Sequence, residues 1–337
     1  MPATSAPLLR AETSEGIALP VLDITNPAFK LELDEAALPA EIERFVAEEQ
    51  RRQRVPGWLM RLVLAIFARR SHLVRTMRRA RAGYLPGLAT YYLKLGADNL
   101  PPPLDDTIDR QIVSSLAARS VRLRLEQLAR LLAEALTPEL AGRPEAPLRL
   151  FNIAGGPAMD SLNALILIAA ERRDLLAGRP IVIDVLDIDP AGPAFGRKAL
   201  RALQGEGQAL AGLDIGLEDA RWDWRDLDAL AALLWRRRAG EAVSAISSEG
   251  GLFEYGTDAE ITGVLRTLRG ALPAGTVFAG SVTRGDAATR LFRKGSPFPI
   301  VPRGLEAFSA LAEAAGWRVA ASRQAAFSDQ VLLRPRP

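Results

Sequence analysis

Short apolar runs alternate with amphipathic helical segments through the second half of the chain, and this alternation restricts the fold more than any other feature. Because the runs are continuously apolar, they are typical of parallel strands buried on both faces of a sheet. A closing pair of runs, 317–321 and 326–333, adds two strands. The pattern predicts an α/β sandwich with a mostly parallel seven-stranded sheet. We expect strands near 148–153, 181–187, 213–218, 243–248 and 276–282, and helices near 159–172, 191–204, 226–238, 258–271 and 303–315.

The first run leads into the turn Asn152-Ile-Ala154-Gly155-Gly156-Pro-Ala158, and a helix follows. Glycine lets a backbone come close to a ligand, and a helix N-terminus offers free N–H groups. A plain tight turn would have the same sequence. The second run begins about thirty residues later, the length of one βαβ unit. It ends in Asp187-Ile188-Asp189, where a carboxylate can accept hydrogen bonds from a ribose diol.

This strand, glycine turn and second-strand acid resemble the first motif of class I S-adenosylmethionine (SAM)-dependent methyltransferases. The resemblance covers about residues 105–335 and implies a Rossmann-like sandwich. Asn152 stands where an acid is usual, and Ala154 and Ala158 stand where glycines are usual. The resemblance implies that the cofactor is held by Asn152, Ala154, Gly155, Gly156, Asp187 and Ile188.

Two further strand ends carry candidate residues. After the third strand, Asp219 and Asp223 compete to accept from the adenine amino group. We favour Asp223, since Trp224 beside it could flank the purine; core packing is the alternative for that tryptophan. After the fourth, Ser247–Tyr255 looks like the corresponding stretch of the leucine carboxyl methyltransferase-like group. That likeness places Glu249 and Gly250 under SAM. It also places Arg119, on a long helix expected near 106–136, at the SAM carboxylate; a solvated arginine is the alternative.

Residues 1–104 are expected to form an N-terminal arm and an α-helical cap, and residues 105–337 the SAM-binding domain. Proline-rich breaks divide the cap, and helices are expected after Pro39 and Pro56. Aromatic residues could line a pocket under the cap and face a sulfonium, although packing is their commoner role. The substrate-binding candidates are Tyr84, Tyr91, Tyr92, Phe253 and Tyr255, and the catalytic candidates are Tyr92, Glu249 and Tyr255.

From Gln50 to Ala97 the chain has no acidic residue. A cationic amphipathic helix can lie on an anionic membrane surface, and a solvated basic face on the cap is the alternative. The segment lacks the interleaved aromatics of RNA-binding proteins, so we expect no nucleic-acid partner. Its arginines are Arg51, Arg52, Arg54, Arg61, Arg69, Arg70, Arg75, Arg78, Arg79 and Arg81.

Composition excludes several chemistries. The chain has no cysteine, which excludes a disulfide framework and thiol catalysis, and a single histidine excludes a His-rich metal site. No metal-ligand spacing is visible, so we expect no metal. The N-terminus lacks the pattern of a signal peptide, and no apolar run approaches a membrane span, so a cytoplasmic enzyme is expected.

The sequence therefore favours a SAM-dependent transferase that methylates a small molecule enclosed under the cap. Two alternatives stay open. A methyltransferase-like cyclase of the azetidine-2-carboxylate synthase type would convert SAM itself to azetidine-2-carboxylate and methylthioadenosine. A non-catalytic protein of the same fold would bind SAM and use its basic cap to dock on a partner or a membrane. The sequence does not indicate the oligomeric state.

Overall fold

The computed structural model describes residues 8–31, 36–78, 83–237 and 242–337, with the backbone alone at 60–64 and 68. Arg79 and Arg81 lie outside the described residues, as does the side chain of Arg61. In the described part of the chain, no helix is long and apolar enough to cross a membrane.

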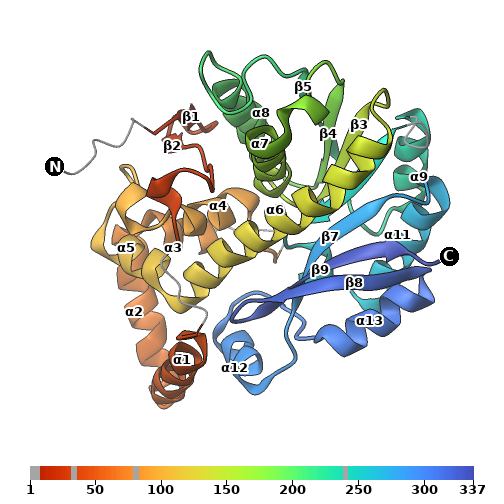
Figure 1. Cartoon of the computed structure of the whole chain (residues 1–337). Coiled ribbons are helices and arrows are strands. Elements are labelled where there is room, and N and C mark those ends of the chain that lie inside the picture. The colour runs from red at the N-terminus through yellow and green to blue at the C-terminus, as the bar shows by residue number, and fades with distance from the viewer. Residues whose placement is uncertain (1–7, 32–35, 79–82, 238–241) are drawn as a thin grey trace.

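A seven-stranded sheet has the order β5-β4-β3-β6-β7-β9-β8 (Figure 1). The first five strands run parallel, and β9 pairs antiparallel with both β7 and β8. The predicted mostly parallel sheet is therefore confirmed. Its strands are β3 (Leu148–Ile153), β4 (Ile181–Asp187), β5 (Ile215–Arg221), β6 (Val243–Ser248), β7 (Val277–Thr283), β8 (Trp317–Gln324) and β9 (Ser328–Pro335).

Helices cover both faces of this sheet, because its strands are apolar on both sides. On β3, Leu148 and Leu150 belong to the core under one set of helices, and Phe151 and Ile153 to the core under the other. The first set is α6 (Leu116–Gly142), α7 (Met159–Arg172) and α8 (Ala191–Leu203), and the second is α9 (Leu227–Arg236), α11 (Asp258–Ala271) and α13 (Leu305–Ala314). The short helices α10 (Leu252–Tyr255) and α12 (Ala287–Gly295) lie in connections for which we predicted none.

The N-terminal helices gather at one end of the sandwich, and α6 runs between them and the sheet (Figure 1). They are α1 (Leu38–Arg52), α2 (Gly57–Arg70), α3 (His72–Arg78), α4 (Gly87–Leu95) and α5 (Thr107–Ser114), together with the 3-10 turns η1 (Pro27–Phe29) and η2 (Ala97–Asn99). A third 3-10 turn, η3 (Arg173–Leu175), follows α7 in the sandwich. The prediction of one helix near 106–136 is wrong. The chain breaks at Ser115, which is extended and caps α6 by accepting from Ala118 N.

Residues 10–20, expected to form part of an irregular arm, pair as strands β1 (Arg10–Glu12) and β2 (Ala18–Pro20). The arm continues along the first helical layer, where Leu22 N donates to the Tyr91 hydroxyl and Ile24 N to Asn163 Oδ1. Apolar residues on either side of position 104 belong to one continuous core. The N-terminal helices therefore share a core with the sandwich.

Three glycine backbones meet where α4, the β3–α7 turn and α8 converge. A Cβ added at Gly87 would lie 2.8 Å from Gly156 Cα, and one at Gly192 would lie 2.6 Å from that same atom. Such distances are shorter than carbon atoms tolerate, and here the neighbouring atoms are backbone. The absence of a side chain at Gly87 therefore lets the first turn of α4 rest directly on the glycine turn.

We predict that Gly87→Ala lowers the free energy of unfolding by about 1–3 kcal/mol, the usual cost of overpacking. Gly57→Ala is the matched control. Gly57, like Gly87, is the first residue of a helix and follows a proline, but a Cβ added at Gly57 would have no atom within 4 Å. Urea unfolding of both variants measures the difference. Equal stabilities would show that α4 does not depend on this contact.

Candidate active site

A cavity of about 1170 Å³ opens beyond the carboxyl ends of β3, β4, β5 and β6. Its other walls come from α1, α4, the α5–α6 junction and the segment following α12. Strand β3 pairs with β4 on one side and β6 on the other, so the cavity lies where the strand order reverses. Open α/β sheets bind ligands at this position. We call it the central cavity.

The turn after β3 contributes Ala154 and Gly155 to the cavity wall. Ala154 and Ala158 both have left-handed backbones, with φ of 51° and 57°. A Cβ at Gly155 would lie 2.0 Å from Asn152 Oδ1, because the Asn152 side chain fills the space beneath the turn. The two other residues assigned to the cofactor here lie outside the cavity lining: Asn152 is fully buried, and Gly156 packs against Gly87 and Gly192.

A buried polar network supports this turn from below. Asn152 Nδ2 donates to Asp160 Oδ1 at 2.6 Å and to Ser247 Oγ at 2.9 Å. Asp160 Oδ1 also accepts from Ser161 N at 2.9 Å. Burial, followed by the nearby charge of Glu249, raises the pKa of Asp160 to about 6. Asp160 was not among the sequence candidates.

At the end of β4, Asp187 lies in the cavity wall. Its Oδ2 accepts from Gly156 N at 3.0 Å and its Oδ1 from Asp189 N at 2.9 Å. Burial raises the pKa of Asp187, and these N–H donors act against that shift. Ile188 also lines the cavity and is 39% exposed. Asp189 accepts from Ala191 N at 3.0 Å, at the start of α8.

The two candidate acids after β4 lie in different places. Asp223 lines the cavity, whereas Asp219 pairs with Arg197 and is not part of the lining. Hydrogen bonds from Arg225 lower the pKa of Asp223, so this carboxylate is ionised. Trp224 follows it in the cavity wall, with its ring centroid 5.2 Å from that of Tyr84.

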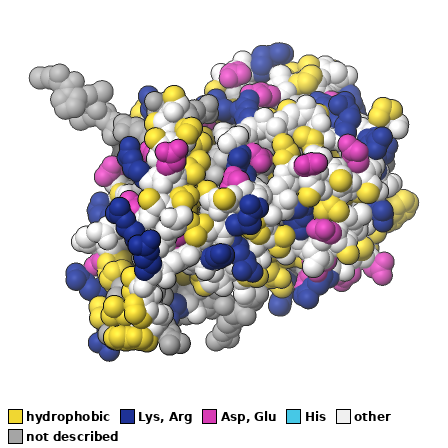
Figure 2. All heavy atoms as spheres, turned by 90° about the horizontal axis from the view of Figure 1, so that it is seen from below, with side chains coloured by type: hydrophobic (Ala, Val, Ile, Leu, Met, Phe, Trp, Pro, Cys, Tyr) yellow, Lys and Arg dark blue, Asp and Glu magenta, His cyan; other side chains and the backbone are white. Residues whose placement is uncertain are grey.

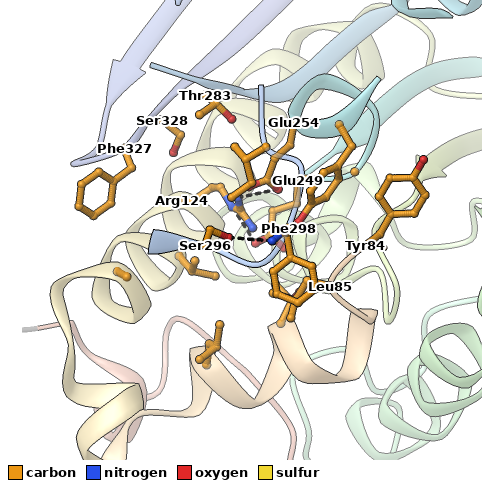
Figure 3. A pocket seen from close by; sticks show the side chains of 18 of the residues that line it. Tyr84, Leu85, Arg124, Glu249, Glu254, Thr283, Ser296, Phe298, Phe327 and Ser328 are labelled. Atoms are coloured by element: carbon orange, nitrogen blue, oxygen red, sulfur yellow. Dashed lines mark hydrogen bonds and ion pairs between the residues drawn. The ribbon is translucent and has the colours of Figure 1, made fainter. Parts of the chain in front are cut away.

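The segment after β6 brings Glu249 into a buried cluster of charges (Figure 3). Lys94 Nζ donates to Glu249 Oε2 at 2.5 Å, and Arg124 Nε lies 3.5 Å from Glu249 Oε1. Arg124 also approaches Glu254, at 3.6 Å. All four side chains line the cavity, beside the backbone of Gly250. Lys94 and Arg124 were not among the sequence candidates, although each is a cation within a mostly apolar helical stretch.

The aromatic candidates divide into two groups. Tyr84 and Tyr255 line the cavity, with ring centroids 5.1 Å apart. The expectation that the other three line it is wrong. Tyr91 is fully buried and donates to Pro20 O, because α4 packs between the arm and the sandwich. Tyr92 faces His72, and Phe253 packs between Phe278 and Phe308 under the sheet.

Arg119 lines the cavity at the start of α6, but its guanidinium forms a two-point ion pair with Glu41 of α1. Nearby are the rings of Phe45, Phe292 and Phe327, the last two stacked at 4.8 Å. We call this region the distal lobe. Its walls also carry hydroxyls, from Ser115, Thr283 and Ser328 among others, and Figure 3 shows the last two beside Phe327.

No protein-family model and no curated protein matches the chain. Among solved structures, it is similar to a possible exported protein from Bordetella parapertussis, with 18% identity, 90% of this chain and 96% of that chain covered, and a TM-score of 0.55. It is also similar to the mitomycin 7-O-methyltransferase MmcR, with 18% identity, 90% of this chain and 74% of that chain covered, and a TM-score of 0.43. Another similar structure is human N-acetylserotonin methyltransferase, solved with SAM, with 15% identity, 79% of this chain and 70% of that chain covered, and a TM-score of 0.40.

The chain has the mostly parallel seven-stranded α/β sandwich, with a closing pair of strands, that the sequence resemblance implies. The Bordetella match extends over nearly all of both chains, so it includes the N-terminal helices as well as the sandwich.

We predict that the stability difference between Asp160→Asn and the wild type changes with pH. An aspartate titrates near pH 3.9 when unfolded, so a folded pKa of about 6 stabilises the fold fully below about pH 4. That stabilisation is lost as the pH rises through about 6. As the pH rises across this window, the free energy of unfolding of Asp160→Asn should therefore increase by up to about 3 kcal/mol relative to that of the wild type.

Urea unfolding of both proteins at several pH values measures this trend. Asp228→Asn, which removes an exposed carboxylate from α9, is the control for the loss of a surface charge. A difference between Asp160→Asn and the wild type that stays constant with pH would show that folding does not raise the pKa of Asp160.

Proposed function

We propose that this protein is a SAM-dependent methyltransferase whose acceptor is a small molecule held in the distal lobe. One observation carries the proposal. The glycine turn, Asp187 and the Asp223–Trp224 pair line one wall of a single cavity, at the switch point of the sheet. This wall thus combines a backbone turn with two carboxylates, Asp187 as an acceptor for the ribose and Asp223 as an acceptor for the adenine.

The donor set suits SAM at each point. Each Asp187 oxygen receives one backbone N–H and keeps a lone pair for a ribose hydroxyl. Asp223 is ionised and can accept from an adenine amino group, while Ile188 and Trp224 offer apolar surface to its ring. Arg124 Nε and Glu249 Oε1 are separated by 3.5 Å, which exceeds a usual N–H···O distance. Each can therefore engage the charged amino-acid end of SAM.

SAM supplies a methyl group that is already activated by the sulfonium. The residues of the site then have to align the acceptor and exclude water. Burial, followed by the charge of Glu254, raises the pKa of Tyr255, so its hydroxyl stays protonated at neutral pH. Tyr255, a catalytic candidate from sequence, accordingly serves as a hydrogen-bond donor and as an aromatic face.

The cavity is larger than one ligand requires. Pockets that enclose a drug-sized ligand measure roughly 300–1,000 Å³, and the central cavity measures about 1170 Å³. A cyclase acting on SAM alone needs no second compartment. The distal lobe, with Phe45, Phe292 and Phe327, favours a second substrate with a flat apolar body. Methyl transfer is therefore the better-supported reaction.

We expect Asp187→Asn to weaken SAM binding by about 1.5–3 kcal/mol, the scale of hydrogen bonds to a charged group. Asp219→Asn is the control, because that acid lies near the carboxyl end of the neighbouring strand β5 but outside the cavity lining. Isothermal titration calorimetry with SAM measures both. If SAM gives neither heat nor a thermal shift with the wild type, the proposal fails.

Incubation with SAM alone distinguishes the two chemistries. A methyltransferase should release no methylthioadenosine, and it should form S-adenosylhomocysteine when planar phenols, amines or carboxylic acids are supplied as a panel. Mass spectrometry of the products measures both. Enzyme-dependent methylthioadenosine with azetidine-2-carboxylate would establish the cyclase instead. SAM binding without either product across the panel would favour the non-catalytic alternative.

A further inference from the structure

Helix α2 stands out from the rest of the molecule because its apolar side chains face solvent. Every described residue from Arg51 to Arg70 is exposed. Seven large hydrophobic side chains are exposed in the described part of the chain, and five lie in this stretch. The other two are Ile188, in the central cavity, and Trp235, on α9. The five are Val55 (36%), Trp58 (63%), Leu59 (36%), Ile66 (50%) and Phe67 (37%).

Arginines lie at both ends of this apolar helix. Arg51, Arg52 and Arg54 precede it, and Arg69 and Arg70 close it. Arg52 pairs with Glu49, and Arg70 lies 3.5 Å from Asp106. Within the described part of the chain, no ion pair engages Arg51, Arg54 or Arg69. Figure 2 looks at this end of the molecule and shows hydrophobic side chains beside arginines at its left.

The charge at both ends decides what can cover this surface. Two copies pairing antiparallel through α2 would place the arginines before one helix against Arg69 and Arg70 of the other. That arrangement would join apolar side chains but bring like charges together, at a cost in free energy. An anionic surface instead attracts both ends while the apolar side chains between them are buried. A helix of 14 residues is about 21 Å long, too short to span a bilayer but long enough to lie in its interface.

We propose that α2 and its flanking arginines dock the protein on an anionic lipid surface. Trp58 is suited to this position, because its ring is apolar and its indole N–H reaches the headgroup region. Helix α1 leads directly into α2 and lines the distal lobe through Phe45 and Arg52. Docking through α2 therefore holds the distal end of the central cavity near the bilayer, independently of which reaction the cavity performs.

Co-sedimentation of the full chain with vesicles tests the proposal. We expect binding to phosphatidylcholine vesicles that contain phosphatidylglycerol, at least tenfold weaker binding to phosphatidylcholine alone, and loss of binding as salt rises. Trp58→Ala and the double variant Arg54→Glu with Arg69→Glu should each reduce binding at least fivefold. Circular dichroism and thermal unfolding establish that the variants fold.

Matched controls are available on the other side of the molecule. Trp235→Ala removes a tryptophan from α9 that is even more exposed than Trp58, and Arg201→Glu with Arg236→Glu makes the same change of net charge. Neither control should alter vesicle binding. Equal losses with the controls would show unspecific adsorption and overturn the proposal. Absence of vesicle binding, together with a dimer that Trp58→Ala dissociates, would assign the surface to a second copy and also overturn it.

Discussion

The close contact of α4 with the glycine turn governs how the N-terminal helices and the sandwich fit together. Gly87 brings a helix backbone against Gly156, and this is possible only because neither residue has a side chain. Two turns of helix further along α4, Lys94 reaches Glu249, just beyond the end of β6. Both charges are almost fully buried, and separating them would leave each without its partner at a cost of about 3–5 kcal/mol. Helix α4 is therefore a fixed wall of the cavity.

The charges around the turn depend on one another for the same reason. Glu249 is held by Lys94 and approached by Arg124, and its charge contributes to the raised pKa of Asp160 on the other side of the turn. A buried group that changes its charge in such a cluster changes the electrostatics of its neighbours. The glycine turn thus lies between a buried carboxyl beneath it, whose pKa is raised to about 6, and an ion cluster at its edge.

The sheet could be predicted from sequence because strands buried on both faces are apolar at consecutive positions. The acids at the strand ends could be predicted because a chain leaving a parallel strand enters the ligand-binding edge. Lys94 and Arg124 could not, since their role comes from contacts with residues more than a hundred positions away. Tyr91 and Tyr92 were misplaced for a related reason. Helix α4 is buried almost all round, so its sequence has no polar face to show which side meets the cavity.

Alanine at position 154 illustrates how the turn departs from glycine without losing its shape. A left-handed alanine costs about 1–2 kcal/mol relative to its ordinary conformations. A Cβ added at Gly251 would lie only 2.4 Å from the methyl carbon of Ala154, so the absence of a side chain at Gly251 makes room for this methyl group. The turn after β6 therefore supplies the space that the turn after β3 needs, and Gly251 is itself left-handed at φ 66°. Because the methyl of Ala154 packs into this gap, the two loops that border the proposed SAM site constrain each other, and neither can be altered in size independently.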